Sequence, residues 1–347
     1  MSGTSLDGID LAEINITVSN TENNKEEWDY TILTSETISY PKYWKLDLQH
    51  AISFSKEKMT IFNKEYTSYL ATVISNFITK HQITCLDAVC SHGHTIWHQP
   101  ENGLTLQIGN LPEIADLINE KVVCDFRVQD VALGGNGAPL VPIGDRLLFN
   151  EYDYCLNLGG FANISFESKG KRIAYDVCPV NIVLNVLAEE LGFPYDDSGN
   201  FAKKGKLNQL LFQQLNDLKY YQEAAPKSLG LEWVQKNIFP ILDVSEISIF
   251  DKLHTVTEHI AFQLASEFQE NTSVLVTGGG AYNHFLLARI QYYKKVELVV
   301  PSAKLIEYKE ALIFGLLGVL RLRNEVNCLA SVTGAAKDHC SGFIYNS

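Results

Sequence analysis

Three glycine-bearing turns, each beside an apolar strand pattern, constrain this chain more than any other feature. They read Gly3-Thr-Ser-Leu-Asp-Gly8, Asn157-Leu-Gly-Gly-Phe-Ala-Asn163 and Gly278-Gly-Gly-Ala-Tyr-Asn283. Glycine lets backbone N–H groups converge on an anion without a Cβ in the way, so such turns can cradle phosphate. Each turn alone is equally compatible with an ordinary hairpin or loop. Three of them together favour a phosphorylated ligand clamped between two domains.

The pattern around these turns predicts an α/β fold. Apolar residues alternate over 9–18 with one slip, which is typical of a bulged strand, and recur at helical spacing over 58–80. Short apolar strands are expected at 86–91, 154–158 and 273–277. No turn has the spacing of a Walker A loop or a dinucleotide fingerprint, which disfavours the P-loop and Rossmann folds. The first two turns lie about half a chain apart, a weak sign of internal duplication.

Composition narrows the class of protein. A chain of 347 residues with 46% hydrophobic content can bury two domain cores. A formal net charge of -13 without a basic cluster argues against nucleic acid as a partner. The most apolar stretch, 311–320, is too short to cross a bilayer, and no leader is visible, so a soluble cytoplasmic protein is expected. Seven cysteines without a Cys-x-x-Cys pair favour reduced thiols.

Motifs spread from end to end resemble the anhydro-N-acetylmuramic acid kinases, a branch of the actin, hexokinase and heat-shock-70 superfamily. Each motif alone is weak, but together and in order they form a specific signature. The motifs are Met-Ser-Gly-Thr-Ser-Leu-Asp-Gly-Ile-Asp (1–10), Ser-His-Gly-His-Thr-Ile-Trp-His-Gln-Pro (91–100), Thr-Leu-Gln-Ile-Gly (105–109), Val-Cys-Asp-Phe-Arg (123–127), Gly-Gly-Asn-Gly-Ala-Pro-Leu-Val-Pro (134–142), Asn-Leu-Gly-Gly-Phe-Ala-Asn-Ile (157–164), Pro-Lys-Ser-Leu-Gly (226–230), Gly-Gly-Gly-Ala-Tyr-Asn (278–283), Glu-Ala (310–311) and Val-Thr-Gly-Ala (332–335).

The resemblance implies a fold and an activity. The fold is a two-domain, actin-like ATPase of duplicated ribonuclease-H-like units with a nucleotide cleft between them. Residues 1–147 with 329–347 are expected to form the first domain and 148–328 the second. The implied reaction consumes ATP, water and 1,6-anhydro-N-acetylmuramic acid and gives N-acetylmuramic acid 6-phosphate and ADP in cell-wall recycling. The resemblance also implies a homodimer.

The three turns are then the nucleotide-binding motifs of the superfamily. ATP is expected to contact two phosphate-binding hairpins and one adenosine-binding turn. Asp7 is expected to orient Mg²⁺ or its water shell, because a carboxylate cannot approach phosphate without repulsion. The expected cofactor-binding residues are Gly3, Thr4, Ser5, Leu6, Asp7, Gly8, Ile9, Asp10, Gly159, Gly160, Asn163, Gly278, Gly279, Gly280 and Asn283.

Asp176 is the expected catalytic residue. The family's catalytic segment Asp-Thr-Gly-Pro-Gly-Asn reads Asp-Val-Cys-Pro-Val-Asn at 176–181. Aspartate, proline and asparagine keep their register, whereas bulkier residues replace a threonine and two glycines. A single carboxylate acting as base can activate the water that attacks the anomeric carbon, because the departing oxygen is captured by phosphorus. The alternative role for Asp176 is that of a strand-end cap.

Five residues are expected to contact the sugar: His94, Thr95, Arg127, Asn181 and Glu310. Arg127 can pair with the lactyl carboxylate and Glu310 with hydroxyl or amide groups, although a surface ion pair and a helix-start charge explain them equally well. His92, His94 and His98 raise the alternative of a metal site, but without a nearby Glu or Cys they fit a sugar cleft better.

Two further residues carry open alternatives. Trp97 can stack on a pyranose ring or fill the core, and Lys227 can approach phosphate or stay solvated.

The start of the chain departs from the family pattern. Family members normally have a short strand and a glycine ahead of Met-Ser-Gly-Thr, whereas this sequence begins at that methionine. A hairpin that lacks one arm leaves a sheet position unpaired and the first turn poorly held. Two explanations stay open: a further strand is missing from the start through a misassigned or truncated beginning, or the protein is weakly active.

Two other functions compete with this one. The first is another sugar kinase or a phosphatase of the superfamily, which uses Asp176 to deprotonate a hydroxyl. The second is a nucleotide-binding switch without catalysis, whose behaviour would not depend on Asp176. A panel of sugars offered with ATP and Mg²⁺ separates them.

Overall fold

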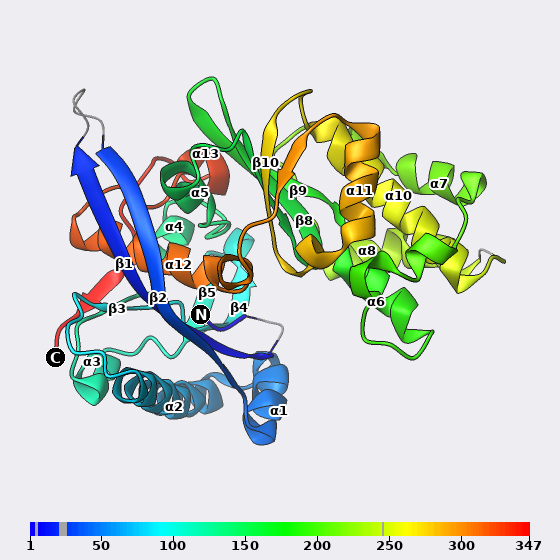
Figure 1. Cartoon of the computed structure of the whole chain (residues 1–347). Helices are drawn as coiled ribbons and strands as arrows, with labels where there is room; N and C mark the ends of the chain where they lie inside the picture. Colours follow the sequence, from blue (N-terminus) through cyan, green and yellow to red (C-terminus); the bar gives the residue numbers. More distant parts are fainter. Residues whose placement is uncertain (4–5, 21–25, 245) are drawn as a thin grey trace. The chain divides into compact units, whose positions relative to one another are not determined.

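The computed structural model describes residues 1–3, 6–20, 26–244 and 246–347. It divides the chain into two α/β units (Figure 1): unit 1 comprises Met1–Leu148 with Tyr308–Ser347, and unit 2 comprises Phe149–Glu307. The expectation of an α/β fold in two parts is confirmed. Along the chain the units change at 148/149 and at 307/308, and most of helix α12 (Ala303–Leu322) belongs to unit 1. The domain bounds expected from the sequence, 147/148 and 328/329, stay a prediction.

The described residues of unit 1 contain three small groups of strands. β1 (Gly8–Asn20) and β2 (Glu26–Ser39) form an antiparallel ladder with a register shift at Glu13/Ile14. The second group has the order β12-β6-β3, with β6 (Val122–Cys124) parallel to β3 (Val89–Ser91) and antiparallel to β12 (Phe343–Tyr345). The third group pairs β4 (His94–Gln99) with β5 (Leu104–Ile108).

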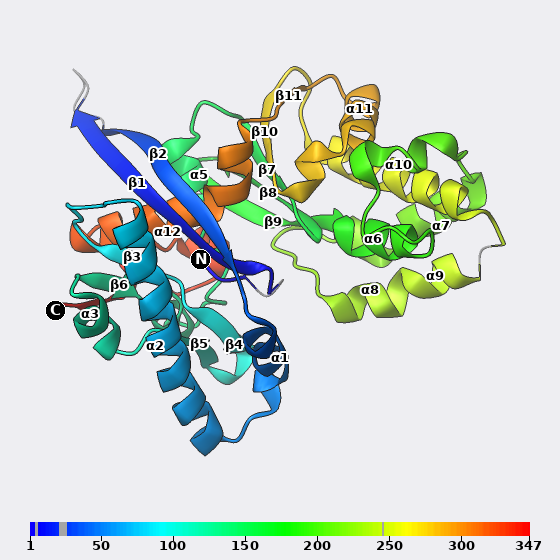
Figure 2. The ribbon, with the colours of Figure 1, turned by 60° about the horizontal axis from the view of Figure 1, so that its bottom comes forward.

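Helix α2 (Lys56–Lys80) shows why the sequence forms these elements. Ser55 caps it by accepting from the Lys58 N–H at 3.3 Å. Its buried side chains recur every three or four residues from Met59 to Phe77, and most of them belong to the hydrophobic core of unit 1. Figure 2 shows the helix running along one side of that unit. The other helices of unit 1 are α1 (Lys42–His50), α3 (Glu113–Ile118), α4 (Val128–Ala132), α5 (Pro142–Leu148) and α13 (Ala330–Thr333).

Unit 2 is built on one mixed sheet of order β11-β10-β7-β8-β9. β7 (Tyr154–Leu158) is its central strand, antiparallel to β8 (Phe161–Ser168) and parallel to β10 (Ser273–Thr277). β9 (Lys171–Pro179) and β11 (Glu297–Val299) form the edges. The helices are α6 (Asn181–Glu189), α7 (Gln209–Asn216), α8 (Leu231–Asn237), α9 (Phe239–Asp243), α10 (Ile249–Glu267) and α11 (His284–Tyr293).

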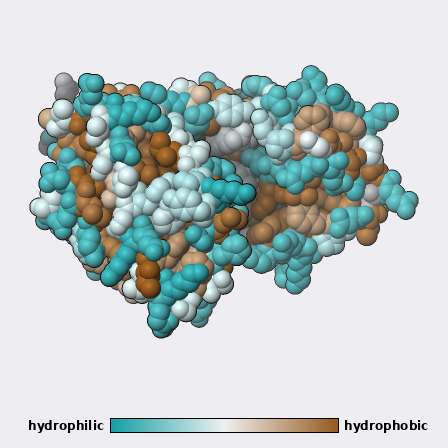
Figure 3. Space-filling model, turned by 90° about the horizontal axis from the view of Figure 1, so that it is seen from below, coloured by the Kyte–Doolittle hydropathy of each residue, from teal (hydrophilic) through white to brown (hydrophobic). Residues whose placement is uncertain are grey.

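Each unit has its own hydrophobic core, as expected of two domains. The core of unit 1 packs α2 against β6 and neighbouring strands, and that of unit 2 packs α6 and α10 against the five-stranded sheet. Apolar side chains on the face in Figure 3 are interspersed with hydrophilic ones. No helix in the described part of the chain is long and apolar enough to span a bilayer. All seven cysteines are free thiols.

Candidate functional site

Two of the three glycine turns lie side by side in unit 2. β7 and β10 are parallel neighbours with Asn157 opposite Thr277, so the turns that follow them leave the same edge of the sheet. Close packing demands glycine here. A Cβ on Gly278, which has a φ of +79°, would lie 2.7 Å from the Asn157 Oδ1, and one on Gly280 would lie 2.6 Å from the Leu158 Cβ.

The start of helix α6 fastens the turn that follows β7. The N–H groups of Val180 and Ile182 donate to the Gly160 carbonyl at 2.8 and 3.2 Å. Asn181 adds a side-chain bond, because its Nδ2 donates to the Leu158 carbonyl at 3.1 Å. Asn181, a predicted sugar ligand, thus holds the end of β7 in place.

Asp176 lies on β9 directly opposite Asn163 on β8. The register shifts between Ala162 and Asn163, which leaves Val177 as an extra residue on β9. Bulges of this kind re-aim neighbouring side chains and are common beside active sites. Because residues that face each other across a ladder project to the same side of the sheet, Asp176 shares a face with Asn163, which is exposed beside the Gly159-Gly160 turn.

Hydrogen bonds position Asp176 without neutralising it. The Leu229 N–H donates to its Oδ2 at 2.9 Å, and the Tyr220 hydroxyl donates to its backbone carbonyl at 2.6 Å. Burial raises the pKa of the Asp176 carboxyl, and the Leu229 N–H partly opposes that shift. Oδ1 has no hydrogen-bond partner among the described residues. A carboxylate with one free oxygen and a raised pKa can accept a proton from water.

Lys227 supports the strand that carries Asp176. Its carbonyl accepts from the Asp176 N–H at 3.2 Å, and its Nζ lies 4.8 Å from the centre of the Tyr220 ring. Its Nζ also donates to the Tyr220 carbonyl at 3.4 Å. The Lys227 side chain therefore packs against an aromatic ring. The two roles considered from the sequence, a solvated lysine and a phosphate ligand, both stay predictions.

Three bulky residues of the segment 176–181 face the core and not the surface. Val177 and Val180 are at most 1% exposed, and Cys178 is fully buried. All three belong to the hydrophobic core of unit 2. The residues that replace threonine and glycine of the family segment therefore pack in the core and do not project from the surface of the site.

The first glycine turn belongs to unit 1, and Thr4 and Ser5 lie outside the described residues. Gly8 is needed because a Cβ there would lie 2.6 Å from the Ile38 carbonyl oxygen. Asp7 is exposed, and its hard carboxylate oxygens fit the preference of Mg²⁺. Asp10 is engaged, since the Thr37 hydroxyl donates to its Oδ1 at 2.7 Å. The remaining predicted residues of this turn, Leu6 and Ile9, are buried.

Arg127 is fixed by protein groups on one side of its guanidinium. Its Nε donates to the His92 Nε2 at 3.0 Å and its Nη1 to the Gly137 carbonyl at 2.6 Å. Burial and the arginine lower the pKa of His92 well below its usual value, so a neutral ring accepts this bond. Burial raises the pKa of Glu310, and Arg127 is the main group that opposes the shift. These contacts bring the predicted sugar ligands Arg127 and Glu310 into one electrostatic cluster.

The other predicted sugar ligands of unit 1, His94 and Thr95, are wholly or partly buried and already hydrogen-bonded within the protein. His94 is buried, its Nδ1 lies 2.7 Å from the Ser2 Oγ, and burial lowers its pKa to about 4. Thr95 is half-buried and accepts from Gln107 at 3.4 Å. His98 pairs with Thr105, so the three histidines each have a separate partner.

Trp97 lies at the edge of the unit 1 core. Its Nε1 donates to the Ile52 carbonyl at 3.2 Å, and its ring packs against the buried residues of that core. This placement agrees with the core-filling alternative.

Sequence reasoning missed Asp125, which directly follows Cys124, the last residue of β6. Its backbone has a φ of +59°, its Oδ1 is buried without a hydrogen-bond partner, and burial raises its pKa to about 6. Non-glycine residues rarely adopt this conformation, and those that do are often found at functional sites. The Asp-Phe-Arg motif that contains it was visible in the sequence, but only the arginine drew attention.

Glycine turns at the strand ends of two α/β units, with a carboxylate of raised pKa on a strand next to one of them, are the arrangement expected of a nucleotide-dependent phosphotransferase. Comparison with known proteins specifies the family. A family model described as "Anhydro-N-acetylmuramic acid kinase" matches residues 1–347. The chain belongs to the anhydro-N-acetylmuramic acid kinase family.

Individual relatives agree over nearly the whole chain. The anhydro-N-acetylmuramic acid kinase of Saccharophagus degradans is 32% identical over 99% of this chain and 97% of its own length. That of Clostridioides difficile is 34% identical over 96% of this chain and 94% of its own. A solved structure, the activator of the 2-hydroxyisocaproyl-CoA dehydratase from Clostridium difficile with bound ADPNP, aligns with 50% of this chain and 61% of its own at 16% identity and a TM-score of 0.34.

Proposed function

We propose that this chain is an ATP-dependent kinase that opens 1,6-anhydro-N-acetylmuramic acid with water and phosphorylates O6. The products are N-acetylmuramic acid 6-phosphate and ADP, and the reaction belongs to peptidoglycan recycling. Family membership over the whole length supports this function. The observation that carries the mechanism is the placement of Asp176, with a raised pKa and one unpaired oxygen, beside the Gly159-Gly160 turn.

In this mechanism Asp176 takes the proton of the attacking water. Water adds to the anomeric carbon, and the bond from that carbon to the bridging oxygen breaks. The bridging oxygen attacks the γ-phosphorus of ATP, whose bond to the β-phosphate oxygen breaks so that ADP leaves. No second carboxylic acid is needed, because the leaving oxygen forms a bond to phosphorus. The Leu229 N–H and Tyr220 hydroxyl keep the carboxylate oriented during proton transfer.

Residues of the other turns would hold the nucleotide. Backbone N–H groups of the glycine turns suit the phosphates, and Gly278–Gly280 suit the adenosine. Asp7 would hold Mg²⁺, which neutralises charge on the phosphates when bound. Arg127 and Glu310 would contact the lactyl carboxylate and the sugar.

The decisive experiment compares Asp176→Asn with Asp153→Asn. Asp153 lies just ahead of β7, at the opposite end of that strand from the glycine turn, and accepts from Ser273. Turnover of the anhydro sugar should fall by about a thousandfold or more in Asp176→Asn, with ATP binding retained, and stay near wild type in Asp153→Asn. In H₂¹⁸O the label should appear at the anomeric carbon. Equal activity of the two variants would refute the role of Asp176.

A substrate panel separates the remaining alternatives. The proposed enzyme should consume ATP only with the anhydro sugar, whereas another sugar kinase would phosphorylate an open sugar without taking up water oxygen. A nucleotide-binding switch would bind ATP and consume none with any sugar. We further propose a cytoplasmic homodimer, which light scattering of the purified protein and cell fractionation can test.

A further inference from the structure

Three buried side chains of unit 1 that lie far apart in the sequence meet at one point: Asp130, Cys328 and His339. A carboxylate oxygen, the thiol sulfur and a ring nitrogen lie within 4.8 Å of one another. The exposed fractions of the three residues are 0%, 1% and 6%. None of them is among the nucleotide-binding or sugar-binding residues expected from the sequence. The function of this cluster therefore has to be sought outside the proposed reaction.

Hydrogen bonds hold all three side chains in place. The Cys328 N–H donates to the His339 carbonyl at 3.0 Å, and the His339 N–H donates to the Cys328 carbonyl at 3.1 Å, so the two residues form an antiparallel bridge. Residues directly opposite in such a pair project to the same face. Asp130 reaches this face from α4, where its Oδ2 accepts from the Gly137 N–H and its Oδ1 from the Thr333 hydroxyl, both at 2.7 Å. The fold thus positions the three polar atoms by itself.

The ring of His339 directs a lone pair into the cluster. Its Nδ1 lies 3.1 Å from the Lys337 carbonyl oxygen, which can only accept, so Nδ1 carries the proton and Nε2 of the neutral ring is an acceptor. Nε2 is buried without a hydrogen-bond partner among the described residues. It lies 3.6 Å from the Asp130 Oδ1, which is too far for a hydrogen bond. Histidines that bind metals have this arrangement, in which the other ring nitrogen donates to a carbonyl or carboxylate.

Charge in the cluster also favours a cation. His339 is the one described side chain within ion-pair distance of Asp130, and a fully buried carboxylate is costly without a compensating positive charge. Arg127 acts on Asp130 and Cys328 from farther away, because its guanidinium is bonded to His92 and Gly137. A divalent ion would neutralise the carboxylate and a thiolate at the same time.

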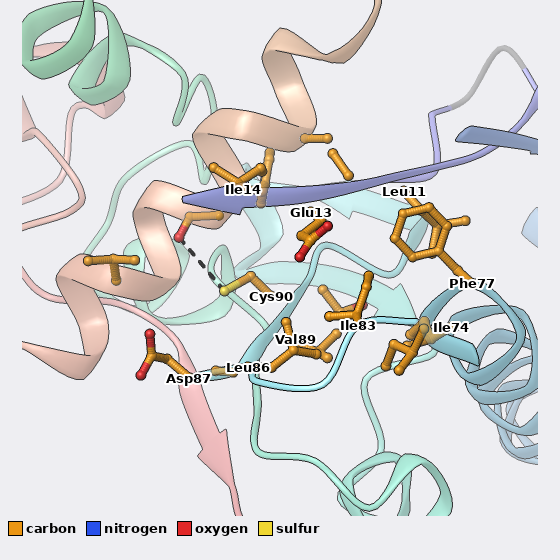
Figure 4. A pocket seen from close by; sticks show the side chains of 18 of the residues that line it. Leu11, Glu13, Ile14, Ile74, Phe77, Ile83, Leu86, Asp87, Val89 and Cys90 are labelled. Atoms are coloured by element: carbon orange, nitrogen blue, oxygen red, sulfur yellow. Dashed lines mark hydrogen bonds between the residues drawn. The ribbon is translucent and has the colours of Figure 1, made fainter. Parts of the chain in front are cut away.

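Cys90 shows how a cysteine of the same unit is placed without such neighbours. Its Sγ donates to the Gly315 carbonyl of α12 at 3.7 Å, beside a pocket lined mainly by apolar side chains (Figure 4). In the described part of the chain, no cysteine other than Cys328 meets a histidine and a carboxylate in a group of this kind. Cys90 therefore provides a matched control for Cys328.

We propose that Asp130, Cys328 and His339 form a structural site for Zn²⁺ or a divalent ion of similar chemistry. Carboxylate oxygen, thiolate sulfur and imidazole nitrogen are the ligands that zinc takes, and water would fill the fourth position. Bonds of about 2.0–2.3 Å to a tetrahedral ion place ligand atoms roughly 3.3–3.8 Å apart, and the 3.6 Å between the His339 Nε2 and the Asp130 Oδ1 already lies in that range. The Cys328 thiol would release its proton to solvent as its sulfur binds the ion.

The ion would fasten several segments of unit 1 to one another. Asp130 belongs to α4, whereas Cys328 and His339 lie on either side of α13. The Gly137 peptide extends the connection, because its N–H donates to Asp130 and its carbonyl accepts from the Arg127 Nη1 at 2.6 Å. A bound ion would therefore stabilise the loop that holds the Arg127 guanidinium.

Metal titrations of the full chain, prepared without a histidine tag and stripped with a chelator, test this proposal. The wild type should bind one equivalent of Zn²⁺, and Cys328→Ser and His339→Gln should bind it about a hundredfold or more weakly. Cys90→Ser should match the wild type. Co²⁺ should give the visible bands of a tetrahedral site together with a sulfur-to-cobalt charge-transfer band, which Cys328→Ser should lose. Excess Mg²⁺ should not compete, because it prefers oxygen ligands.

Thermal unfolding provides a second measurement. Zn²⁺ should raise the melting temperature of the wild type and of Cys90→Ser, and it should leave that of the two ligand variants unchanged. Circular dichroism shows whether each variant folds, and His339→Gln keeps the test decisive if Cys328→Ser does not. Equal Zn²⁺ affinity of the wild type and His339→Gln, or a wild type that binds Co²⁺ without the sulfur band, would overturn the proposal. So would a wild type that binds neither ion, since the trio would then be only a buried polar cluster.

Discussion

Asp176 and Asn163 face each other across the β8–β9 ladder, and they do so only because Val177 is bulged out of register. Without the extra residue, Asn163 would stand opposite Val177, and the carboxylate would project to the other face of the sheet. The chemistry proposed for unit 2 therefore depends on a backbone irregularity as much as on the identity of residue 176.

The raised pKa of Asp176 predicts the pH dependence of activity. As a base it must be ionised, so kcat/KM should fall as the pH drops through a value above the usual range of an aspartate. A pH profile with the anhydro sugar, measured where circular dichroism shows an intact fold, checks this limb. An acid limb at the pKa of an ordinary exposed aspartate would contradict the assignment.

Asp125 should make the protein less stable as the pH rises from about 4 to 6. Its folded pKa of about 6 lies above the 3.8 of an ordinary aspartate, so the folded state favours the protonated form. Its relative stabilisation is complete below pH 3.8 and is lost as the pH rises through 6. Asp125→Asn should therefore raise the free energy of unfolding at pH 7 by about 2–3 kcal/mol. Denaturant titrations of both proteins at pH 4 and pH 7 measure the difference, and equal stability at pH 7 would contradict the prediction.

Gly280 and its neighbour Gly279 should respond differently to alanine. A Cβ on Gly280 would lie 2.6 Å from the Leu158 Cβ, whereas the nearest group that a Cβ on Gly279 would meet among the described residues is the Asn181 Nδ2, at 3.9 Å. Gly280→Ala should cost about 1–3 kcal/mol of stability and weaken ATP binding, because the turns after β7 and β10 are forced apart. Gly279→Ala should fold with near wild-type stability. Thermal unfolding and nucleotide titration of the pair provide the test.

Asn181 should matter for the turn that follows β7. In Asn181→Ala the Leu158 carbonyl loses its side-chain donor, which should cost about 1 kcal/mol of stability and raise the KM for ATP. Asn237→Ala removes an equivalent bond, from its Nδ2 to the Trp233 carbonyl on α8, and serves as the control. A loss of stability without any change in KM for ATP would confine Asn181 to a structural role.

Many strands and helices could be predicted from the sequence, because the spacing of apolar residues follows the side chains that are buried. The predicted strands at 154–158 and 273–277 coincide with β7 and β10, and the predicted helix at 58–80 begins two residues earlier because Ser55 caps it. The slip expected within 9–18 is the register shift at Glu13/Ile14. The strand expected at 86–91 is shorter, because only its last three residues pair with β6.

Features that depend on tertiary contacts could not be read this way. Nothing local marks the bulge at Val177, the bond from Leu229 to Asp176 or the orphan oxygen of Asp125. The place where the chain passes from one unit to the other depends on tertiary contacts too. The apolar pattern of α12 does not say which unit it packs against, and that is decided by contacts such as Ile313 against Gly144.

The buried thiol of Cys178 can report local opening of the structure. Its thiol lies two residues beyond Asp176, fully enclosed, and burial raises its pKa far above that of a free thiol. Alkylating reagents attack thiolates, so they can reach this position only when the connection between β9 and α6 opens. The rate at which Cys178 is alkylated should therefore report how often this connection opens, and bound nucleotide should lower that rate.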